Sequence, residues 1–359
     1  MSMMTDPRWN ELADILINYS TQTKKDEKVF ITMMETDTLP LVERVYSHAV
    51  QAGALPQVEF VSSYLERELL KHGTMDQLDW VPEIQAYGME WADVYIGLRG
   101  FRNPFEFEGV QSDRIAVHKR ALGKTSRMRN EMTRWVLVRV PNEPFAQRAR
   151  TRIDSMMDFF FEATLRDWES EVERYAEICD VFQSAEHVRI KGVGTDIQFS
   201  TKGRVYAIGD GTHNMPDGEI YTAPVDDSAE GHIYFEFPGV YSGQLVEGIR
   251  LEFSEGEVVK ATAEENEDLL HRILDTDEGA KRLGEFGVGT NFGIDQFSYD
   301  ILYDEKIGGT IHLALGRAYA ENNGVNDSAL HWDIVKDLRK EGEIYLNGDK
   351  VFADGEFAL

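Results

Sequence analysis

The chain has 359 residues, a length that suits two domains with a core each. Its 42% hydrophobic and 28% charged residues are typical of globular proteins and exclude collagen-like, fully disordered and small disulfide-rich chains. Asp and Glu number 64 against 37 Lys and Arg, so the formal net charge is −27, which excludes nucleic acid, itself a polyanion, as a partner.

Cys179 is the single cysteine, so neither an internal disulfide nor a cysteine-rich zinc site is possible. It lies in a helical stretch without a cationic neighbour, which predicts a buried structural thiol. The first residues, MSMMTDPRWNELADIL, lack the basic and apolar regions of a secretory signal. No run approaches the roughly 18 apolar residues of a membrane span. We therefore expect a cytoplasmic protein with no membrane partner.

The N-terminal half alternates helical and extended patterns. In chain order, apolar spacing predicts a helix over 9–19, a strand over 28–33, a helix from 38 through 49, strands over 57–61, 92–98 and 134–140, and a helical segment over 151–178. The strand–helix–strand unit has the length of a parallel crossover connection. These patterns predict an open α/β domain over residues 1–180.

From residue 187 onward the chain is rich in strands and turns. Alternating apolar runs occur at 188–190, 197–199, 206–208, 233–237 and 249–253, and Asn347-Gly348-Asp349 predicts a hairpin turn. One helix, roughly 262–283, interrupts them. We expect a strand-rich C-terminal domain over residues 181–359, so that the fold combines α/β with α+β architecture.

Two glycine-rich runs do not show the context of a nucleotide site. Neither 192–194 nor 284–289 follows a strand and opens a helix, as dinucleotide-binding loops do, so we expect turn glycines in both.

The candidate chemistry lies beyond residue 210. Glu219 follows a Pro-Asp-Gly turn that would deliver it onto a strand, and Glu285 lies among glycines and apolar residues, as either a structural acceptor or a ligand. His312 stands in an apolar run, where a hydrogen-bonded core histidine is the commoner role. His331 and Asp333 are two residues apart, so in an extended segment both would project from one face and chelate one ion.

Together these five residues supply the mixed nitrogen and oxygen ligands that divalent transition metals prefer. They exceed what one catalytic ion with open positions needs, whereas two ions that share a carboxylate and a water would use all of them. Spacing alone leaves open whether the five converge.

Four segments resemble the thermophilic metallo-aminopeptidases of the aminopeptidase T family. They are NMPDGEIYTAP (214–224), LGEFGVGTN (283–291), LYDEKIGGTIHLALG (302–316) and SALHWD (328–333). The likeness is specific from about residue 180 to the C-terminus and looser before it.

The resemblance implies that two divalent ions (zinc, cobalt or manganese) are bound by Glu219, Glu285, His312, His331 and Asp333. It also implies that Tyr319, seven residues after His312, is the active-site tyrosine, which would donate a hydrogen bond to the oxyanion. The reaction would be hydrolysis of the N-terminal peptide bond of short peptides, or of another small molecule, by a water that bridges the ions. The family further implies a homodimer.

Two further functions stay open. The chain is shorter than the well-known aminopeptidases of the family on both sides of His312, and a related branch of similar size opens dihydroxypyridine rings with one Fe(II). His312, His331 and Asp333 would form the two-histidine, one-carboxylate triad of such an oxygenase. Retention of Glu219 and Glu285 favours two ions. A non-catalytic metal-binding protein is the third possibility.

Three neighbours of these residues carry expectations of their own. Glu305 is expected to form a local ion pair in a turn, with orientation of a ligand as the alternative. Arg317 would either bind a substrate carboxylate or balance the acidic site. Trp332 should point away from His331 and Asp333 and pack in the core, because side chains alternate along a strand.

Overall fold

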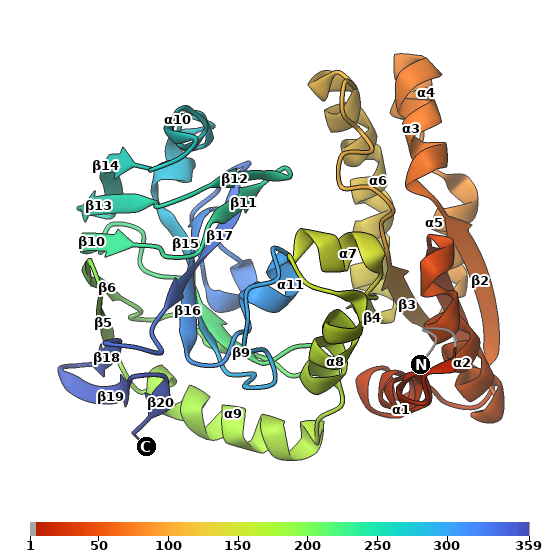
Figure 1. Cartoon of the computed structure of the whole chain (residues 1–359), viewed down its shortest axis with the longest axis horizontal. Helices are drawn as coiled ribbons and strands as arrows, with labels where there is room; N and C mark the ends of the chain where they lie inside the picture. Colours follow the sequence, from red (N-terminus) through yellow and green to blue (C-terminus); the bar gives the residue numbers. More distant parts are fainter. Residues whose placement is uncertain (1–4, 359) are drawn as a thin grey trace. The chain divides into compact units, whose positions relative to one another are not determined.

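The computed structural model describes residues 5–358. Within that range the chain forms two compact units, one of residues up to 165 with 211–216 and one of 166–210 with 217 onward. Figure 1 draws the first in red to olive and the second mainly in green and blue. The expected division near residue 180 falls inside helix α9 (Trp168–Gln183), which packs against strands of the second unit.

The first unit is an α/β layer around a five-stranded parallel sheet in the order β2-β1-β3-β4-β8. Its strands are β1 (Lys28–Met34), β2 (Leu55–Val61), β3 (Val94–Arg99), β4 (Arg134–Arg139) and β8 (Asn214–Met215). Four of them confirm the predicted strands. The fifth, β8, was not predicted, because two residues carry no periodicity. It pairs with β4 after the chain has already built part of the second unit.

Helices connect the parallel strands and cover the sheet of the first unit. They are α1 (Arg8–Asp14), η2 (Ile15–Ser20), η3 (Thr36–Thr38), α2 (Leu39–Gln51), α3 (Ser63–His72), α4 (Met75–Leu78), α5 (Glu83–Trp91), α6 (Ser112–Met132), α7 (Glu143–Arg148) and α8 (Ile153–Thr164). The central strands are continuous apolar runs, as expected of a sheet that is covered on both faces. Ile31, Ile96 and Val136 are completely buried there.

The second unit contains two antiparallel sheets. The larger has the order β14-β13-β10-β6-β5-β18-β19-β20, the smaller β17-β16-β15-β9-β7, and β11 and β12 form a separate ribbon. The strands are β5 (His187–Gly192), β6 (Thr195–Ser200), β7 (Ala207–Gly209), β9 (Glu219–Thr222), β10 (Glu230–Tyr234), β11 (Gly239–Tyr241), β12 (Gln244–Val246), β13 (Arg250–Ser254), β14 (Glu257–Thr262), β15 (Leu283–Gly289), β16 (Thr310–Gly316), β17 (His331–Asp337), β18 (Glu343–Leu346), β19 (Asp349–Ala353) and β20 (Glu356–Phe357).

Aromatic side chains join the two sheets of the second unit. The ring of Phe286, on β15, lies 5.1 Å from that of Phe199 on β6 and 6.2 Å from that of Phe182 on α9. Since neighbours on a strand point to opposite faces, Glu285 faces away from this core. One face of the five-stranded sheet is therefore committed to packing, and the other is free to carry polar groups.

Three predicted features differ from the structure. The helix expected over 262–283 is only α10 (Glu267–Leu274) and the 3-10 turn η4 (Glu278–Lys281). Asn266, with a φ of 60°, sets the start of α10, and the side chain of Asp277 caps η4 by accepting from the amide of Ala280. The segment 151–178 forms two helices, because the side chain of Asp167 caps a new helix by accepting from the amide of Ser170. The expectation of turn glycines at 284–289 is wrong, since Gly284, Gly287 and Gly289 lie inside β15.

None of the described helices has the length and apolarity that a membrane crossing requires. Cys179 lies buried on α9, as expected, and burial raises the pKa of its thiol.

Candidate metal centre

The five residues expected to bind metal lie on one face of the five-stranded antiparallel sheet of the second unit. Glu219 begins β9, Glu285 is the third residue of β15, His312 is the third of β16, and His331 and Asp333 are the first and third of β17. Antiparallel pairing aligns the four strands so that these side chains cross one face of the sheet, from Glu219 opposite Gly289 to His331 opposite Gly316. The structure thus brings together residues that are as much as 114 positions apart (333 − 219).

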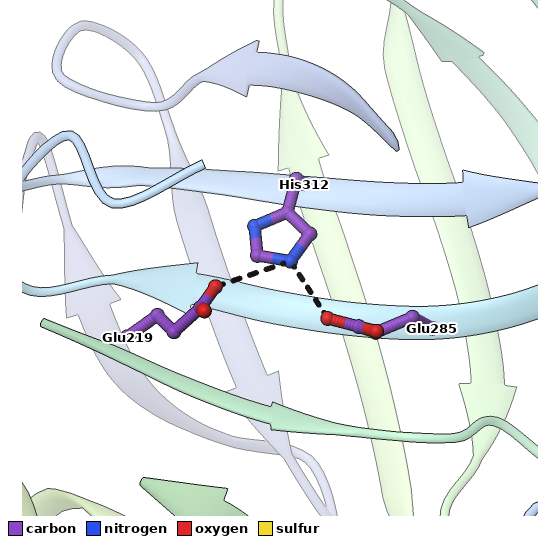
Figure 2. Close-up of side chains that lie close together, drawn as sticks. All are labelled: Glu219, Glu285 and His312. Atoms are coloured by element: carbon purple, nitrogen blue, oxygen red, sulfur yellow. Dashed lines mark hydrogen bonds and ion pairs between the residues drawn. The ribbon is translucent and has the colours of Figure 1, made fainter. Parts of the chain in front are cut away.

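Small residues stand opposite the polar ones on the paired strands. Gly289 pairs with Glu219, Gly287 pairs with His312, and Ala314 pairs with both Glu285 and Asp333. Figure 2 shows the His312 ring crossing over β15 toward both glutamates. Gly287 therefore gives space to the side chain of His312, while Gly284 and Gly289 lie close to backbone atoms of neighbouring segments, and such close approaches explain why these glycines stand in a strand.

Glu219, Glu285 and His312 form a first set of converging donor atoms, all within 4.8 Å of one another. Nε2 of His312 lies 3.1 Å from Oε1 of Glu285 and 3.5 Å from Oε2 of Glu219. All three residues are buried, and such a group of carboxylates and imidazole is a ligand set that divalent transition metals accept.

Glu285, His331 and Asp333 form a second set, whose donor atoms also lie within 4.8 Å of one another. Nε2 of His331 lies 3.4 Å from Oδ2 of Asp333 and 3.7 Å from Oε2 of Glu285. Glu285 thus belongs to both sets, with one oxygen toward each histidine. A carboxylate in that position can bridge two ions.

Three carboxylate oxygens of these sets are buried without a hydrogen-bond partner: Oε2 of Glu219, Oε2 of Glu285 and Oδ1 of Asp333. An unsatisfied buried acceptor is costly, the more so when it is charged. A bound cation would satisfy all three. The residues present therefore fit divalent ions.

Backbone carbonyls orient both imidazoles. Nδ1 of His312 lies 3.1 Å from the carbonyl oxygen of Glu305, and Nδ1 of His331 lies 2.7 Å from that of Arg317. Since a carbonyl only accepts, each Nδ1 donates and each Nε2 faces the carboxylates, which is the usual arrangement around metal-ligating histidine. Glu305 does pair with Lys306, as expected, and its carbonyl also orients the His312 ring.

Arg317 contributes to the site through its carbonyl, which accepts from His331, and the two roles expected of its guanidinium stay predictions. The residue itself is exposed. Trp332 packs as expected: it is buried, and its indole N–H donates to the carbonyl of Val240 at 3.1 Å.

Lys306 is a member of the site that sequence reasoning missed. It is fully buried, and its ammonium lies 3.1 Å from Oε1 of Glu219, 3.9 Å from Oδ1 of Asp217 and in contact with Glu305. Burial by itself lowers the pKa of a lysine, but these three carboxylates outweigh it and hold the pKa well above its ordinary value. The only sequence signal was a lysine between Glu305 and the apolar run that contains His312.

The site has a strong negative potential. Burial lowers the pKa of His312 and His331, yet neighbouring carboxylates outweigh it and raise these pKa values to about 10 and about 9. Burial also raises the pKa of the Glu219 and Glu285 carboxyls, because the charged form is poorly solvated there. A field that holds imidazoles protonated is one that attracts metal cations.

Tyr319 stands beside the second set. It precedes the 3-10 turn η5 (Ala320–Asn322), and its hydroxyl lies 3.4 Å from Nε2 of His331. The residue is 38% exposed, yet loss of solvation around its hydroxyl, followed by the charges of Glu285 and Asp333, raises the pKa of that group, so it remains a proton donor at neutral pH.

Comparisons with known proteins give one consistent result. The model of the thermophilic metalloprotease (M29) family matches residues 5–357. The chain is 25% identical to aminopeptidase 2 of Geobacillus stearothermophilus, over 97% of this chain and 96% of that protein. It is 26% identical to aminopeptidase T of Thermus aquaticus, over 90% and 91%. Among solved structures, wild-type AmpT from Thermus thermophilus matches with a TM-score of 0.85 at 25% identity, over 98% of this chain and 99% of that one.

Proposed function

The chain belongs to the thermophilic metalloprotease (M29) family, and on that premise we propose that it is an aminopeptidase that uses two divalent ions to release the N-terminal residue of short peptides. Relatives over almost its whole length carry the name aminopeptidase, which supports this activity. The observation that carries the two-ion form is the position of Glu285 between two ligand sets.

Each set would hold one ion. Glu219 and His312 would hold the first, His331 and Asp333 the second, and Glu285 would contribute one oxygen to each. When bound, zinc, cobalt or manganese ions would activate a water between them and polarise the scissile carbonyl. The chain's own contribution is to hold the five side chains at fixed distances from one another, because strand pairing fixes their positions.

Tyr319 would act on the reacting carbonyl. Its hydroxyl stays protonated and stands at the rim of the second set, within 3.4 Å of the His331 ring. From there it would donate a hydrogen bond to the oxyanion that develops as water attacks.

The ring-opening oxygenase gains no support from the comparisons. It also needs His312, His331 and Asp333 to converge on one ion. Among residues 5–358, however, both ligand sets contain a single histidine, and His312 lies in a different set from His331 and Asp333. The geometry favours two sites over one triad.

Metal analysis and a peptide assay test the proposal together. We expect about two ions per chain, and cleavage of dipeptides and of aminoacyl p-nitroanilides but not of their N-acetylated forms, since an aminopeptidase requires a free α-amino group. Two ions without any cleavage would favour a non-catalytic metal-binding protein. One iron per chain, with oxygen consumed on hydroxylated pyridines, would contradict the proposal.

The homodimer implied by the family resemblance stays a prediction. Light scattering on the purified protein should give about twice the chain mass of 40.9 kDa. A particle with the mass of one chain would contradict it.

A further inference from the structure

Lys306 is buried where the proposed reaction has no use for a free ammonium. None of its side chain is exposed, and its charged end faces Glu219, Glu305 and Asp217. It cannot reach a substrate from there. A role in the site must therefore run through the residues that it touches.

We propose that Lys306 is a positioning residue that holds Glu219 for the ion of the first set, so that loss of Lys306 weakens this ion and spares the ion of the second set. The inference rests on the proposed two-ion function and deepens it. It states that different residues hold the side chains that bind each of the two ions.

The two oxygens of Glu219 have different surroundings. Oε1 accepts from the Lys306 ammonium at 3.1 Å, while Oε2 has no hydrogen-bond partner and lies 3.5 Å from Nε2 of His312. The ammonium therefore restrains one oxygen and leaves the other to face the ligand set. A charged hydrogen bond of this kind restrains a carboxylate more firmly than a neutral one.

The same short segment also orients the second ligand of the first set. The carbonyl of Glu305 accepts from Nδ1 of His312, and the next residue, Lys306, holds Glu219. The second set is supported elsewhere, since His331 donates to the carbonyl of Arg317. Disturbing residue 306 should therefore act on one set.

Two effects of the ammonium oppose each other. Its charge repels a nearby cation, which by itself would weaken metal binding. Its removal, however, takes a cation away from the buried carboxylate of Asp217 and the half-buried carboxylate of Glu305 as well as releasing Glu219. Breaking a buried charge cluster by removing one partner is strongly unfavourable. We expect the loss of a fixed position for Glu219 to outweigh the relief of charge repulsion, so that metal binding weakens.

Titration calorimetry of metal-free protein with zinc chloride is the test. The wild-type protein should bind two ions. Lys306→Met should bind one with unchanged affinity and the other roughly 10- to 100-fold more weakly, which is the usual cost of losing a residue that supports a ligand. Lys306→Gln, whose amide can still donate to Glu219, should lose less. This partial rescue separates positioning from a general loss of packing.

Lys336→Met is the matched control. Lys336 is also fully buried, and its ammonium contacts Glu236 and the carbonyl of Val193, but it projects from the opposite face of β17. This variant should be destabilised yet bind both ions normally. Circular dichroism would show whether each variant is folded. If Lys306→Met does not fold, the affinities of Lys306→Gln are compared with those of the wild-type protein instead.

Unchanged affinity for both ions in Lys306→Met and Lys306→Gln, or equal weakening of both, would overturn the proposal. A wild-type protein that binds one ion would contradict the two-ion function instead. The role of Lys306 would then be judged by comparing Lys306→Met with Glu219→Gln. The proposal stands if both variants bind the single ion more weakly, and it fails if Lys306→Met binds that ion with unchanged affinity.

Discussion

Gly287 lies directly opposite His312 in the pairing of β15 with β16, and a Cβ at position 287 would fall 2.0 Å from Cε1 of the imidazole. No real side chain tolerates that distance. The absence of one methyl group on β15 thus allows the His312 ring to reach both glutamates of the first set (Figure 2).

Gly287→Ala should displace the His312 ring and weaken the ion of the first set, while the strand remains paired. We expect a clear loss of bound metal and of activity, with only a small fall in the melting temperature. Metal content and the melting temperature would be measured together. Gly123→Ala is the control, because Gly123 lies in helix α6 and an added Cβ would meet open space there. Gly348→Ala would not serve, because Gly348 has a φ of 97°. Normal metal content in Gly287→Ala would contradict the prediction.

Glu285→Ala should lose both ions, because this carboxylate belongs to both sets, whereas His331→Ala should lose mainly the second. Both variants should keep the fold, since the opposite face of the sheet is held by Phe286 and its aromatic neighbours. Elemental analysis of each variant would count the ions.

Glu278→Gln and His232→Ala are controls for these two substitutions, because both residues are exposed in the second unit. They should retain wild-type metal content. Full turnover with normal metal in Glu285→Ala or His331→Ala would show that the ligand assignment is wrong.

Tyr319→Phe removes the hydroxyl that faces the second set and keeps the ring. If this hydroxyl stabilises the oxyanion, kcat should fall by about 10²- to 10³-fold, with KM and metal content little changed. Steady-state kinetics on one aminoacyl p-nitroanilide would measure this. Tyr345→Phe, whose lost hydroxyl contacts Glu343 on β18, is the control. An equal effect of both substitutions on kcat would remove Tyr319 from the mechanism.

Cys179 should react slowly with thiol reagents in the native protein. It is buried, and burial raises the pKa of its thiol, so that at a given pH less of the reactive thiolate is present. Ellman's reagent should titrate one thiol per chain rapidly in denaturant and far more slowly without it. Equally rapid reaction in the folded protein would contradict the buried position.

Local patterns predicted the first unit better than the second. β1, β3 and β4 are mainly apolar runs and β2 alternates polar with apolar residues, and such patterns depend on neighbours in the chain. The helix expected over 262–283 is shorter because Asn266, in the left-handed conformation, delays its start to Glu267, and Asp277 caps a separate 3-10 turn after its end. The glycines of β15 were taken for turns. The role of Gly287, giving space to His312, depends on a strand that begins 23 positions later (310 − 287), so no local pattern shows it.

The sequence by itself determined the types of residue at the site, the order of the motifs and the family, because these are properties of the chain. Only the tertiary structure decided that Glu285 belongs to two ligand sets, that Glu305 and Arg317 act through their carbonyls, and that Lys306 contacts Glu219. The physical reason is cross-strand register: a shift of one residue would turn every ligand of a strand to the other face, and register is set by pairing between distant segments.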